Sequence, residues 1–507
     1  MDNLKEAMQE VEKLTIEDGE IVSVQYKNAE EQMLLPGILS KPLPNHCEVK
    51  IELRPSPESR ILVEIWLPLQ DWNGDFLGTG NGGYAGEIIP LELANGIRRG
   101  YAAANTNLGT EPNIDKLIGK PERWIDFGYR ATHLMTVVGK RVVKAFYGRE
   151  AKSSLFIGGS TGGQQALMEA QRYPDDYDGI LAIAPAHNRT NLHYGFIWNW
   201  LALTESDQSG FTPEQAQRVT EHLLEKYRKE GMCLPGDKFF SCPQWINLDP
   251  AVLNDCEGIT EAQKQALKKI MQGPQDPVSH KKIISPIYTP GSEAVDLGLA
   301  RQSEKESFSY EFFYLFRWVY GKDFDFRRFD FHEDVKRLDQ ALADKLNAVD
   351  VDLHEFRNCG GKMLMLHGMA DPIIPYQDSL EYYNEVIEKD GGIEKTKEYF
   401  RYFPIPGLGH VLGGPGVQDI TAHGFSATPK DKEHDALVAL AEWVKNGTAP
   451  DCLWAVAFED GSIINGILKD TYAYERPCYA YPDCAEYSGF NPNDPDSYCR
   501  TNFDIRE

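Results

Sequence analysis

The chain has 507 residues, 42% of them hydrophobic, and a formal net charge of −25 from 52 basic and 77 acidic side chains. A chain of this length buries a large core and is expected to contain two or three structural units. Its acidity, with no run of basic residues, argues against nucleic acid and anionic membrane surfaces as partners, and no stretch is long and apolar enough to span a bilayer.

The first ten residues are charged and lack the apolar core of a secretory signal. The chain is therefore expected in the cytoplasm if Met1 is its natural start, and outside the cell if a leader has been removed.

Strands and helices alternate up to about residue 186. Residues 1–58 are expected to be peripheral and to carry no chemistry. The predicted elements are a helix at 2–14, strands at 61–68, 75–80 and 101–106, a helix over about 124–147, a strand at 155–159, a helix at 164–173 and a strand at 179–185. This alternation predicts a parallel sheet covered by helices on both faces.

The alternation stops near residue 187. Residues 187–355 hold a predicted helix at 212–229, cysteine-bearing loops and aromatic clusters. An insertion of this length between two sheet strands is typical of a subdomain, and we interpret it as a lid. The core then consists of 1–186 and 356–507.

The second part of the core resumes the alternation. Its predicted elements are a strand from Lys362, a helix at 378–388, a strand at 399–403 and a helix at 434–445. The tail from Asp451 is rich in Tyr, Pro, Cys and Asp, and no sheet strand is predicted in it.

The strand at 155–159 ends in Gly158-Gly159-Ser160-Thr161-Gly162, the G-x-S-x-G pattern of a nucleophile elbow. Glycines flank the serine because a Cβ there would collide with the neighbouring strand or helix. Short patterns of this kind also occur in ordinary loops between a strand and a helix. The elbow therefore needs support from the rest of the chain.

Asp371 and His410 supply that support, because each follows a later predicted strand. The order Ser160, Asp371, His410 is that of the α/β-hydrolase triad, and the carboxyl ends of parallel strands meet at one edge of the sheet. A serine hydroxyl needs a histidine to take its proton, and a carboxylate holds the imidazole in the right tautomer.

Several other residues compete for these roles. His367 lies in the same turn as Asp371, where a structural role is common, whereas His133 and His187 come too early in the chain. The remaining alternatives are His423 and His434 for the base and Asp352 and Asp378 for the acid.

The segment Gly80-Asn81-Gly82-Gly83-Tyr84-Ala85-Gly86 leaves an early predicted strand. Bare backbone N–H groups of such a loop can form one half of an oxyanion hole. The alternative is a flexible loop with no role.

The chain also carries a set of short motifs: 72–78 (WNGDFLG), 80–83 (GNGG), 126–131 (DFGYRA), 160–174 (STGGQQALMEAQRYP), 367–372 (HGMADP), 476–478 (RPC) and 481–482 (YP). In these motifs it resembles the tannase and feruloyl esterase family of α/β-hydrolases, which includes terephthalate monoester hydrolases, from about Val63 to Cys499. The resemblance implies hydrolysis of phenolic acid esters, a lid over the site and no redox cofactor.

The resemblance also implies roles for individual residues. Ser160 would be the nucleophile, His410 the base and Asp371 its orienting acid. The oxyanion donors would be the backbone N–H of Thr161 and that of Gly82 or Gly83. The lid would supply an aromatic clamp, for which the candidates are Phe313, Phe316 and Trp318.

Two departures from the family pattern stand out. The family usually has a disulfide between the residue before the serine and the residue after the histidine, but here those positions are Gly159 and Val411. The family also commonly binds calcium in an aspartate-rich lid loop, and this chain offers only Asp237, Asp249 and Asp255, so no structural calcium and no other metal is expected.

Nine cysteines are an odd number, so at least one thiol is unpaired or pairs between chains. The resemblance suggests Cys242 with Cys256 and Cys478 with Cys499 as disulfides, and reduced thiols are the alternative in a cytosolic protein.

The sequence thus predicts an α/β-hydrolase fold with a lid inserted between the nucleophile and acid strands, acting as a serine esterase on small aromatic esters. The alternatives are a carboxylesterase or acyltransferase for non-phenolic acyl groups, and a non-catalytic binding protein of the same fold. The sequence leaves the oligomeric state open.

Overall fold

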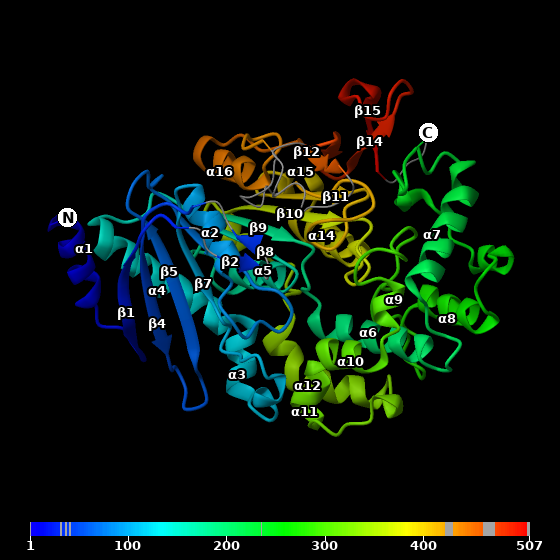
Figure 1. Cartoon of the computed structure of the whole chain (residues 1–507), viewed down its shortest axis with the longest axis horizontal. Coiled ribbons are helices and arrows are strands. Elements are labelled where there is room, and N and C mark those ends of the chain that lie inside the picture. Colours follow the sequence, from blue (N-terminus) through cyan, green and yellow to red (C-terminus); the bar gives the residue numbers. More distant parts are fainter. Residues whose placement is uncertain are drawn as a thin grey trace.

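A nine-stranded mixed sheet forms the centre of the computed structural model, which describes residues 2–30, 33–35, 38–39, 42–234, 236–420, 429–459 and 472–503 (Figure 1). The strand order is β1-β4-β5-β7-β6-β8-β9-β10-β11. The strands are β1 (Gly19–Lys27), β4 (His46–Leu53), β5 (Ile61–Pro68), β6 (Phe76–Thr79), β7 (Ala102–Thr106), β8 (Ser154–Gly159), β9 (Gly179–Ile183), β10 (Lys362–Gly368) and β11 (Phe400–Ile405). From β7 to β11 the neighbouring strands are parallel, as predicted, whereas β1, β4 and β5 are antiparallel additions.

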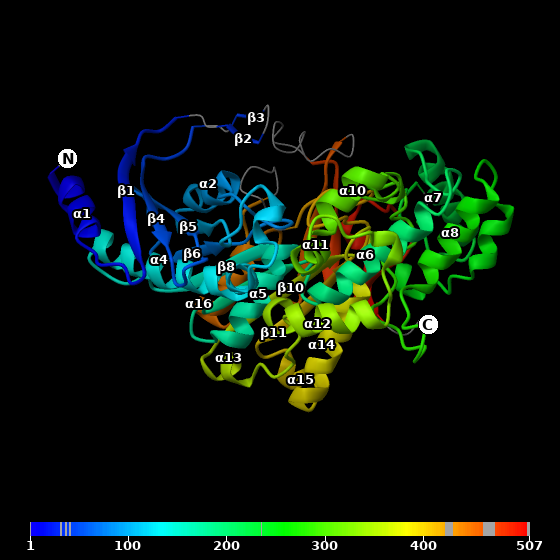
Figure 2. The same ribbon diagram turned by 90° about the horizontal axis from the view of Figure 1, so that it is seen from below.

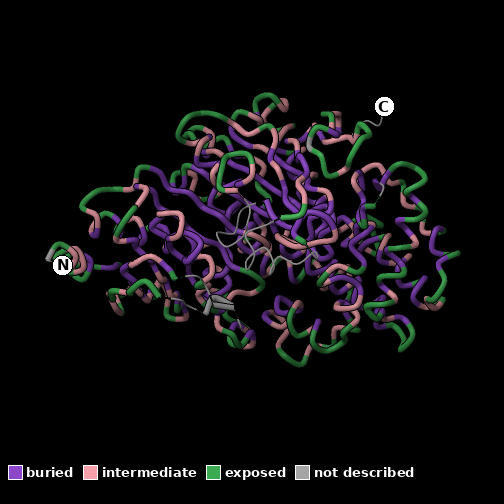
Figure 3. Tube along the Cα trace, turned by 45° about the horizontal axis from the view of Figure 1, so that its top comes forward, coloured by how far each residue is buried: buried purple, intermediate pink, exposed green. Residues whose placement is uncertain are grey.

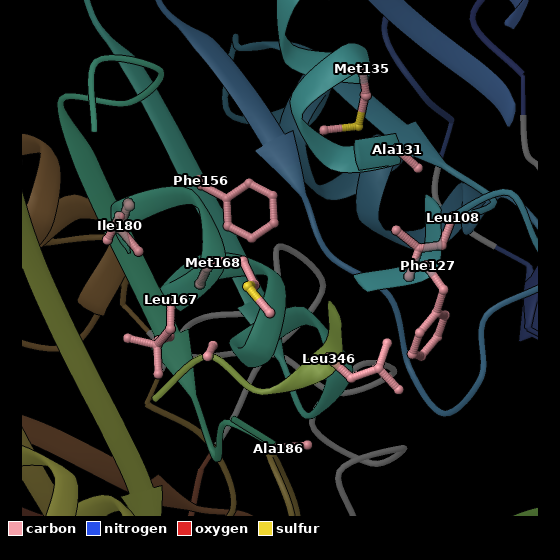
Figure 4. Packing of buried hydrophobic residues seen from close by; sticks show 14 of the residues in the cluster. Leu108, Phe127, Ala131, Met135, Phe156, Leu167, Met168, Ile180, Ala186 and Leu346 are labelled. Carbon is pink, nitrogen blue, oxygen red and sulfur yellow. The ribbon is translucent and has the colours of Figure 1, made fainter. Parts of the chain in front are cut away.

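The two faces of the sheet are filled by alternate residues of each strand, because successive strand side chains point to opposite faces. Phe156 of β8 and Ile180 of β9 join the core on the face covered by α5 (Thr161–Arg172), where Met168 lies close to them (Figure 4). Leu155 of β8 joins the opposite core with Leu440 of α16 (Ala436–Asn446). Burying each such side chain stabilises the fold by about 1.5–3 kcal/mol.

The helices of the core cover both faces, as the alternation predicts. Besides α5 and α16 they are α1 (Asp2–Glu12), α2 (Pro90–Arg98), α3 (Pro121–Ile125), α4 (Ala131–Tyr147), α14 (Tyr376–Asp390) and α15 (Ile393–Thr396). The single helix predicted over 124–147 is divided, because a π-type turn at Asp126–Arg130 joins α3 to α4. None of the described helices is both long and apolar enough to cross a membrane.

The insertion lies between β9 and β10, and in its described residues helices alternate with long loops such as 273–298. Its helices are α6 (Arg189–Leu203), α7 (Pro213–Arg228), α8 (Glu261–Gln272), α9 (Leu299–Gln302), α10 (Lys305–Phe312), α11 (Tyr314–Tyr320), α12 (Glu333–Leu346) and α13 (His354–Asn358). The predicted helix at 212–229 is present as α7, which starts at a capping box between Thr212 and Gln215. Helices α7 and α8 lie at the end of the molecule opposite α1 (Figures 1 and 2).

Two stretches contain strands that were not predicted. In β4, Cys47, Val49, Ile51 and Leu53 are buried at a spacing of two, so residues 1–58 contribute to the main sheet. The tail also forms strands, and the prediction of none there is wrong: β12 (Cys452–Ala457) pairs with β13 (Tyr474–Tyr479), and β14 (Asp483–Tyr487) with β15 (Tyr498–Asn502). A further pair is β2 (Met33–Leu35) with β3 (Ile38–Leu39).

The tail strands are ordered by packing rather than by local sequence. Leu453 and Ala455 of β12 and Cys478 of β13 are buried in the core that also contains α16. Buried segments run through the middle of the molecule and exposed ones lie at its rim (Figure 3). The candidate active site lies at the carboxyl ends of β6, β8, β10 and β11.

Candidate active site

Ser160 lies in a sharp turn between β8 and α5, as the elbow pattern predicts. Its backbone has φ 59° and ψ −115°, a left-handed conformation that is costly for any residue except glycine. Three backbone hydrogen bonds hold the turn: Ser160 N–H donates to the Ile183 carbonyl (2.9 Å), and Gln164 and Ala186 N–H donate to the Ser160 carbonyl (3.1 and 3.0 Å). The strain is therefore maintained by β9, the loop after it and the first turn of α5.

The glycines around the elbow allow backbone to pack directly on backbone. A Cβ on Gly158 would lie 2.4 Å from the Gly162 carbonyl oxygen, and one on Gly80 would lie 2.5 Å from the Gly162 Cα. A Cβ on Gly163 would lie 2.6 Å from the Cα of Pro185. No side chain fits between β6, β8 and the start of α5.

This packing predicts that Gly158→Ala destabilises the fold. Because the colliding atoms belong to the backbone of α5, the free energy of unfolding should fall by about 1–3 kcal/mol or more. The measurement is chemical denaturation followed by circular dichroism.

Gly82→Ala is the matched control, since a Cβ on Gly82 meets no atom within 4 Å. It should unfold within about 0.5 kcal/mol of the parent chain. Equal stability of the Gly158 and Gly82 variants would contradict the backbone packing.

Asp371 and His410 meet where β10 and β11 end. Their side chains join through a hydrogen bond of 2.7 Å between His410 Nδ1 and Asp371 Oδ2. Oδ1 of Asp371 accepts the backbone N–H of Ile373 (2.9 Å) and of Ile374 (3.0 Å). Since Nδ1 of His410 donates to the carboxylate, its Nε2 is left as the acceptor in the neutral ring.

The environment of Asp371 keeps it ionised. Burial raises the pKa of Asp371, but the charge of His410 and the hydrogen bonds from His367 and His410 outweigh burial and hold that pKa below its usual range. The side chain is 1% exposed. A permanent carboxylate beside an imidazole is the arrangement that stabilises an imidazolium ion.

Ser160 and His410 both line a cavity of about 540 Å³. Gly82 and Gly83 line it as well. Its other walls are mainly apolar and come from both the core and the insertion: Ile89, Leu91, Ile157, Ile183, Ala186, Leu192, Phe196, Leu297, Phe312, Tyr314, Ile373, Ile374, Val411 and Leu412, among others. An apolar cavity with a few convergent polar groups is typical of a site for a small organic ligand.

A second cavity, of about 570 Å³, shares His410, Leu412 and Leu297 with the first. Its other walls carry more polar side chains, including Gln217, Lys238 and Asp296. His410 therefore lies between an apolar and a more polar cavity.

Phe313, Phe316 and Trp318 do not line either cavity, contrary to the expectation of an aromatic clamp. All three are fully buried and pack on other rings, such as Phe313 on Phe316 at 5.6 Å between centroids. Phe312 and Tyr314, their neighbours in the sequence, line the first cavity instead. Aromatic content alone cannot show which face of a short helix meets the ligand.

Thr161 and the loop of Gly82 and Gly83 lie together at the start of α5. Thr161 is the first residue of the helix, where a backbone N–H has no acceptor within the helix. The Thr161 hydroxyl donates to the Gly83 carbonyl (2.5 Å), and Gly162 N–H donates to the carbonyl of Asn81 (2.7 Å). The residues predicted to form the oxyanion hole are thus adjacent.

Each competing residue has identified partners. His367 is fully buried, with Nδ1 at 2.8 Å from Ser379 Oγ and Nε2 at 3.0 Å from the Ile374 carbonyl and 3.5 Å from Asp371 Oδ2. The other rivals are paired as follows: His133 with Asp176, His187 with Asp378, His354 with Asp352 and His434 with Asp431. His423 lies outside the described residues.

Gly159 and Val411 face each other across the site. A Cβ on Gly159 would lie 2.7 Å from Val411 Cγ1 and 3.4 Å from Val411 Cβ. Val411 has φ 65°, a strained conformation for a β-branched residue. Cys256, Cys478 and Cys499 are free thiols, so neither of the two suggested disulfides is formed. Contact between Gly159 and Val411 therefore joins the elbow to the histidine loop.

A disulfide should form if both residues are replaced, in Gly159→Cys/Val411→Cys, because the Cβ separation in disulfides is about 3.5–4.5 Å. The oxidised variant should gain about 2–4 kcal/mol in free energy of unfolding, and dithiothreitol should remove the gain. The measurement is denaturation with and without the reductant.

The parent chain is the control and should show no effect of the reductant on stability or activity. Free thiols at both introduced positions after oxidation would show that the two loops are not adjacent.

One group of residues on α4, α5 and the following loop brings metal-ligand atoms together. Ligand atoms of His133, Glu169 and Asp176 lie within 4.8 Å of one another. Burial and then the charge of Asp176 raise the pKa of Glu169 well above its usual range. The raised pKa favours the protonated form of Glu169 in this cluster.

The three aspartates considered for calcium are used differently. Asp237 forms a buried ion pair with Arg476 (3.2 Å), and the Asp249 side chain accepts the backbone N–H of Ala251. Asp255 is the last residue of the same short turn.

Arg189 is a polar residue of the cavity wall that the sequence analysis missed. It is 3% exposed and begins α6, in which no other Arg, Lys, Asp or Glu occurs. A single charged side chain at the start of this helix, directly after a sheet strand and its loop, was the only available signal.

Comparisons with known proteins identify relatives over almost the whole chain. The family model for tannase and feruloyl esterase matches residues 47–500. An uncharacterized esterase of Xanthomonas campestris pv. campestris is 30% identical over 493 residues, which cover 89% of this chain and 84% of the relative. A probable feruloyl esterase B of Aspergillus clavatus is 30% identical over 453 residues, covering 87% and 84%.

Solved structures agree with these relatives. Feruloyl esterase B from Aspergillus oryzae superposes with a TM-score of 0.85 at 25% identity, over 98% of this chain and 100% of the other. A tannin acyl hydrolase from Aspergillus niger superposes with a TM-score of 0.72 at 19% identity, over 98% and 95%, which is evidence for the same fold.

Proposed function

This chain belongs to the tannase and feruloyl esterase family, and from that membership we propose that it hydrolyses esters of phenolic acids through a serine acyl-enzyme. It has the α/β-hydrolase fold and is a carboxylic ester hydrolase. The observation that carries the serine mechanism is the strained Ser160 in one cavity with His410, whose Nδ1 is fixed by Asp371.

In the proposed mechanism Ser160 Oγ attacks the ester carbonyl while His410 Nε2 takes the proton of the Ser160 hydroxyl. Asp371 holds the imidazole and stabilises its positive charge. The backbone N–H of Thr161 and that of Gly82 or Gly83 stabilise the oxyanion. His410 then protonates the leaving alcohol, and a water molecule activated by the same histidine releases the acid.

We assign the acyl group to the apolar cavity of 540 Å³ and the alcohol to the more polar cavity beyond His410. The leaving oxygen must receive its proton from His410, so the alcohol departs on the histidine side. An aromatic acid fits apolar walls such as Phe196, Phe312 and Ile374.

The insertion, residues 187–355, is proposed to act as a lid over the two core segments 1–186 and 356–507. It contributes Phe196, Phe312 and Tyr314 to the acyl cavity and Lys238 to the other. A lid of this kind excludes water from the reacting groups.

Hydrolysis of methyl ferulate, methyl gallate and p-nitrophenyl butyrate, measured side by side, tests the proposal. A phenolic acid esterase should show the highest kcat/KM with one of the two phenolic esters. Preference for the butyrate would identify a carboxylesterase for other acyl groups, and transfer of the acyl group to an added alcohol instead of water would identify an acyltransferase. No hydrolysis of any ester would indicate a binding protein.

A further inference from the structure

Arg189 connects the insertion to the elbow through four hydrogen bonds to neutral oxygen atoms. Nε and Nη2 donate to Gln164 Oε1 (2.8 and 2.5 Å), Nη2 donates to Thr161 Oγ1 (2.7 Å) and Nη1 donates to the Tyr314 hydroxyl (3.0 Å). Gln164 in turn donates to the Leu346 carbonyl (2.6 Å). The guanidinium is thus held between α5 and two helices of the insertion.

Two partners fix the direction of the Thr161 hydroxyl proton. A hydroxyl has one proton to donate. Because Arg189 donates to Thr161 Oγ1, the threonine proton must point elsewhere, and it is donated to the Gly83 carbonyl at 2.5 Å. A hydrogen bond from a cation polarises the hydroxyl and strengthens the bond that it donates.

The Thr161 hydroxyl holds the carbonyl of Gly83, and a turn hydrogen bond from Ala85 N–H to the Gly82 carbonyl (3.0 Å) holds the peptide before it. It has φ 56°, and a Cβ placed on it would meet no atom within 4 Å, so the packing around it is open. In the described part of the chain, the Thr161 hydroxyl makes the one hydrogen bond that reaches the Gly83 backbone. Glycine has the largest backbone freedom of all residues, so an unsupported Gly83 would sample many orientations.

We propose that Arg189 is a positioning residue of the oxyanion hole, which acts through the Thr161 hydroxyl to fix the backbone of Gly83. The inference rests on the proposed function, because the oxyanion hole serves the serine mechanism. It assigns the insertion a part in transition-state stabilisation besides forming a cavity wall.

The test compares Thr161→Val, which removes the hydroxyl and keeps the backbone N–H, with Thr161→Ser, which keeps both. In Thr161→Val, kcat for a phenolic ester should fall about 10- to 100-fold with KM within about threefold, since an oxyanion donor acts mainly in the transition state. Thr161→Ser should restore kcat to within about threefold of the parent enzyme.

Arg189→Met should reproduce the loss in kcat, and the double variant Arg189→Met/Thr161→Val should be no worse than the poorer single variant. When two residues act through the same series of contacts, the losses from substituting them do not add in free energy. When two residues act independently, their fold-losses in kcat multiply. Inhibition by an aryl boronic acid, which forms a tetrahedral adduct with a serine, should weaken in parallel with kcat/KM, whereas inhibition by the free phenolic acid should not.

Thr136→Val is the matched control. Thr136 on α4 is equally buried, and its hydroxyl bonds to the Thr132 carbonyl and to the hydroxyl of Tyr177, which lies just before β9. This variant loses a buried hydroxyl of the same kind and should keep the parent kcat. Thermal unfolding of all variants shows whether each one is folded.

Three results would overturn the inference and leave the proposed function intact. They are full kcat in Thr161→Val, a Thr161→Ser variant as slow as Thr161→Val, and a loss of kcat in the double variant equal to the product of the two single losses. If Thr161→Val or Arg189→Met does not fold, the other variant decides by the same criterion. A parent enzyme that hydrolyses no phenolic ester would instead contradict the proposed function.

Discussion

Replacing Ser160 with alanine should lower kcat/KM for phenolic esters by about 10⁴- to 10⁶-fold. The expected loss is this large because the nucleophile, base and acid act as a unit, so that removing the nucleophile removes nearly all their contribution. The fold should survive, since the Ser160 side chain makes no cap hydrogen bond to α5. The measurement is steady-state hydrolysis, with intact mass after incubation with a fluorophosphonate that labels catalytic serines.

Ser153→Ala is the control for this experiment. Ser153 directly precedes β8, at the opposite end from Ser160, and its hydroxyl donates to Asp75. This variant should keep the parent activity and take up one fluorophosphonate, whereas Ser160→Ala should take up none. An active or labelled Ser160→Ala enzyme would exclude Ser160 as the nucleophile.

Replacing Asp371 with asparagine should lower kcat by about 10³- to 10⁴-fold at neutral pH. Asparagine preserves the shape of the side chain but its amide can donate to His410 Nδ1, which favours the wrong tautomer of the imidazole. The loss should appear in kcat with little change in KM, because the carboxylate does not line the 540 Å³ cavity proposed for the acyl group. Steady-state kinetics from pH 5 to 9 are the measurement.

The same variant tests the ionisation of Asp371 through stability. Its folded pKa lies below that of an unfolded aspartate, about 3.9, so the carboxylate stabilises the fold above about pH 4 and this contribution is lost as the pH falls through the folded pKa. The difference in unfolding free energy between the parent and Asp371→Asn should therefore narrow below pH 4.

Asp378→Asn is the control for the loss of kcat. It changes a buried carboxylate near His187 and should keep kcat within a few-fold of the parent value.

Much of the core could be predicted because its signals are local. The strand β8, the turn at Ser160 and α5 follow from an apolar run, a cluster of glycines and a helical pattern that lie within twenty residues. The choice of Asp371 and His410 needed only the chain order and the rule that parallel strands end at one edge. The pairing at 2.7 Å fits that choice.

The other elements depend on contacts between distant parts of the chain. Strand β13 contains Pro477 and two charged residues, and its partner β12 lies far from it in the sequence, so neither was recognised. They form strands because they pair with each other and cover the core at α16. The clamp residues were misplaced because Phe312 and Phe313 are equally aromatic, and only the path of the insertion decides which ring faces the cavity. Arg189 could not be recognised before its contacts with Thr161 and Gln164 were known.

The glycines of the elbow also bear on how this enzyme can change. A side chain added at four of these glycines would press on backbone atoms: Gly80, Gly158, Gly162 and Gly163. Almost any substitution there should therefore impair folding, and be removed by selection, before it can alter activity. The cavity walls supplied by α6, α10 and α11 carry no such restriction. New substrate preferences should therefore evolve, or be selected in the laboratory, through the insertion, and libraries are better directed at Phe196 and Phe312 than at the residues around Ser160.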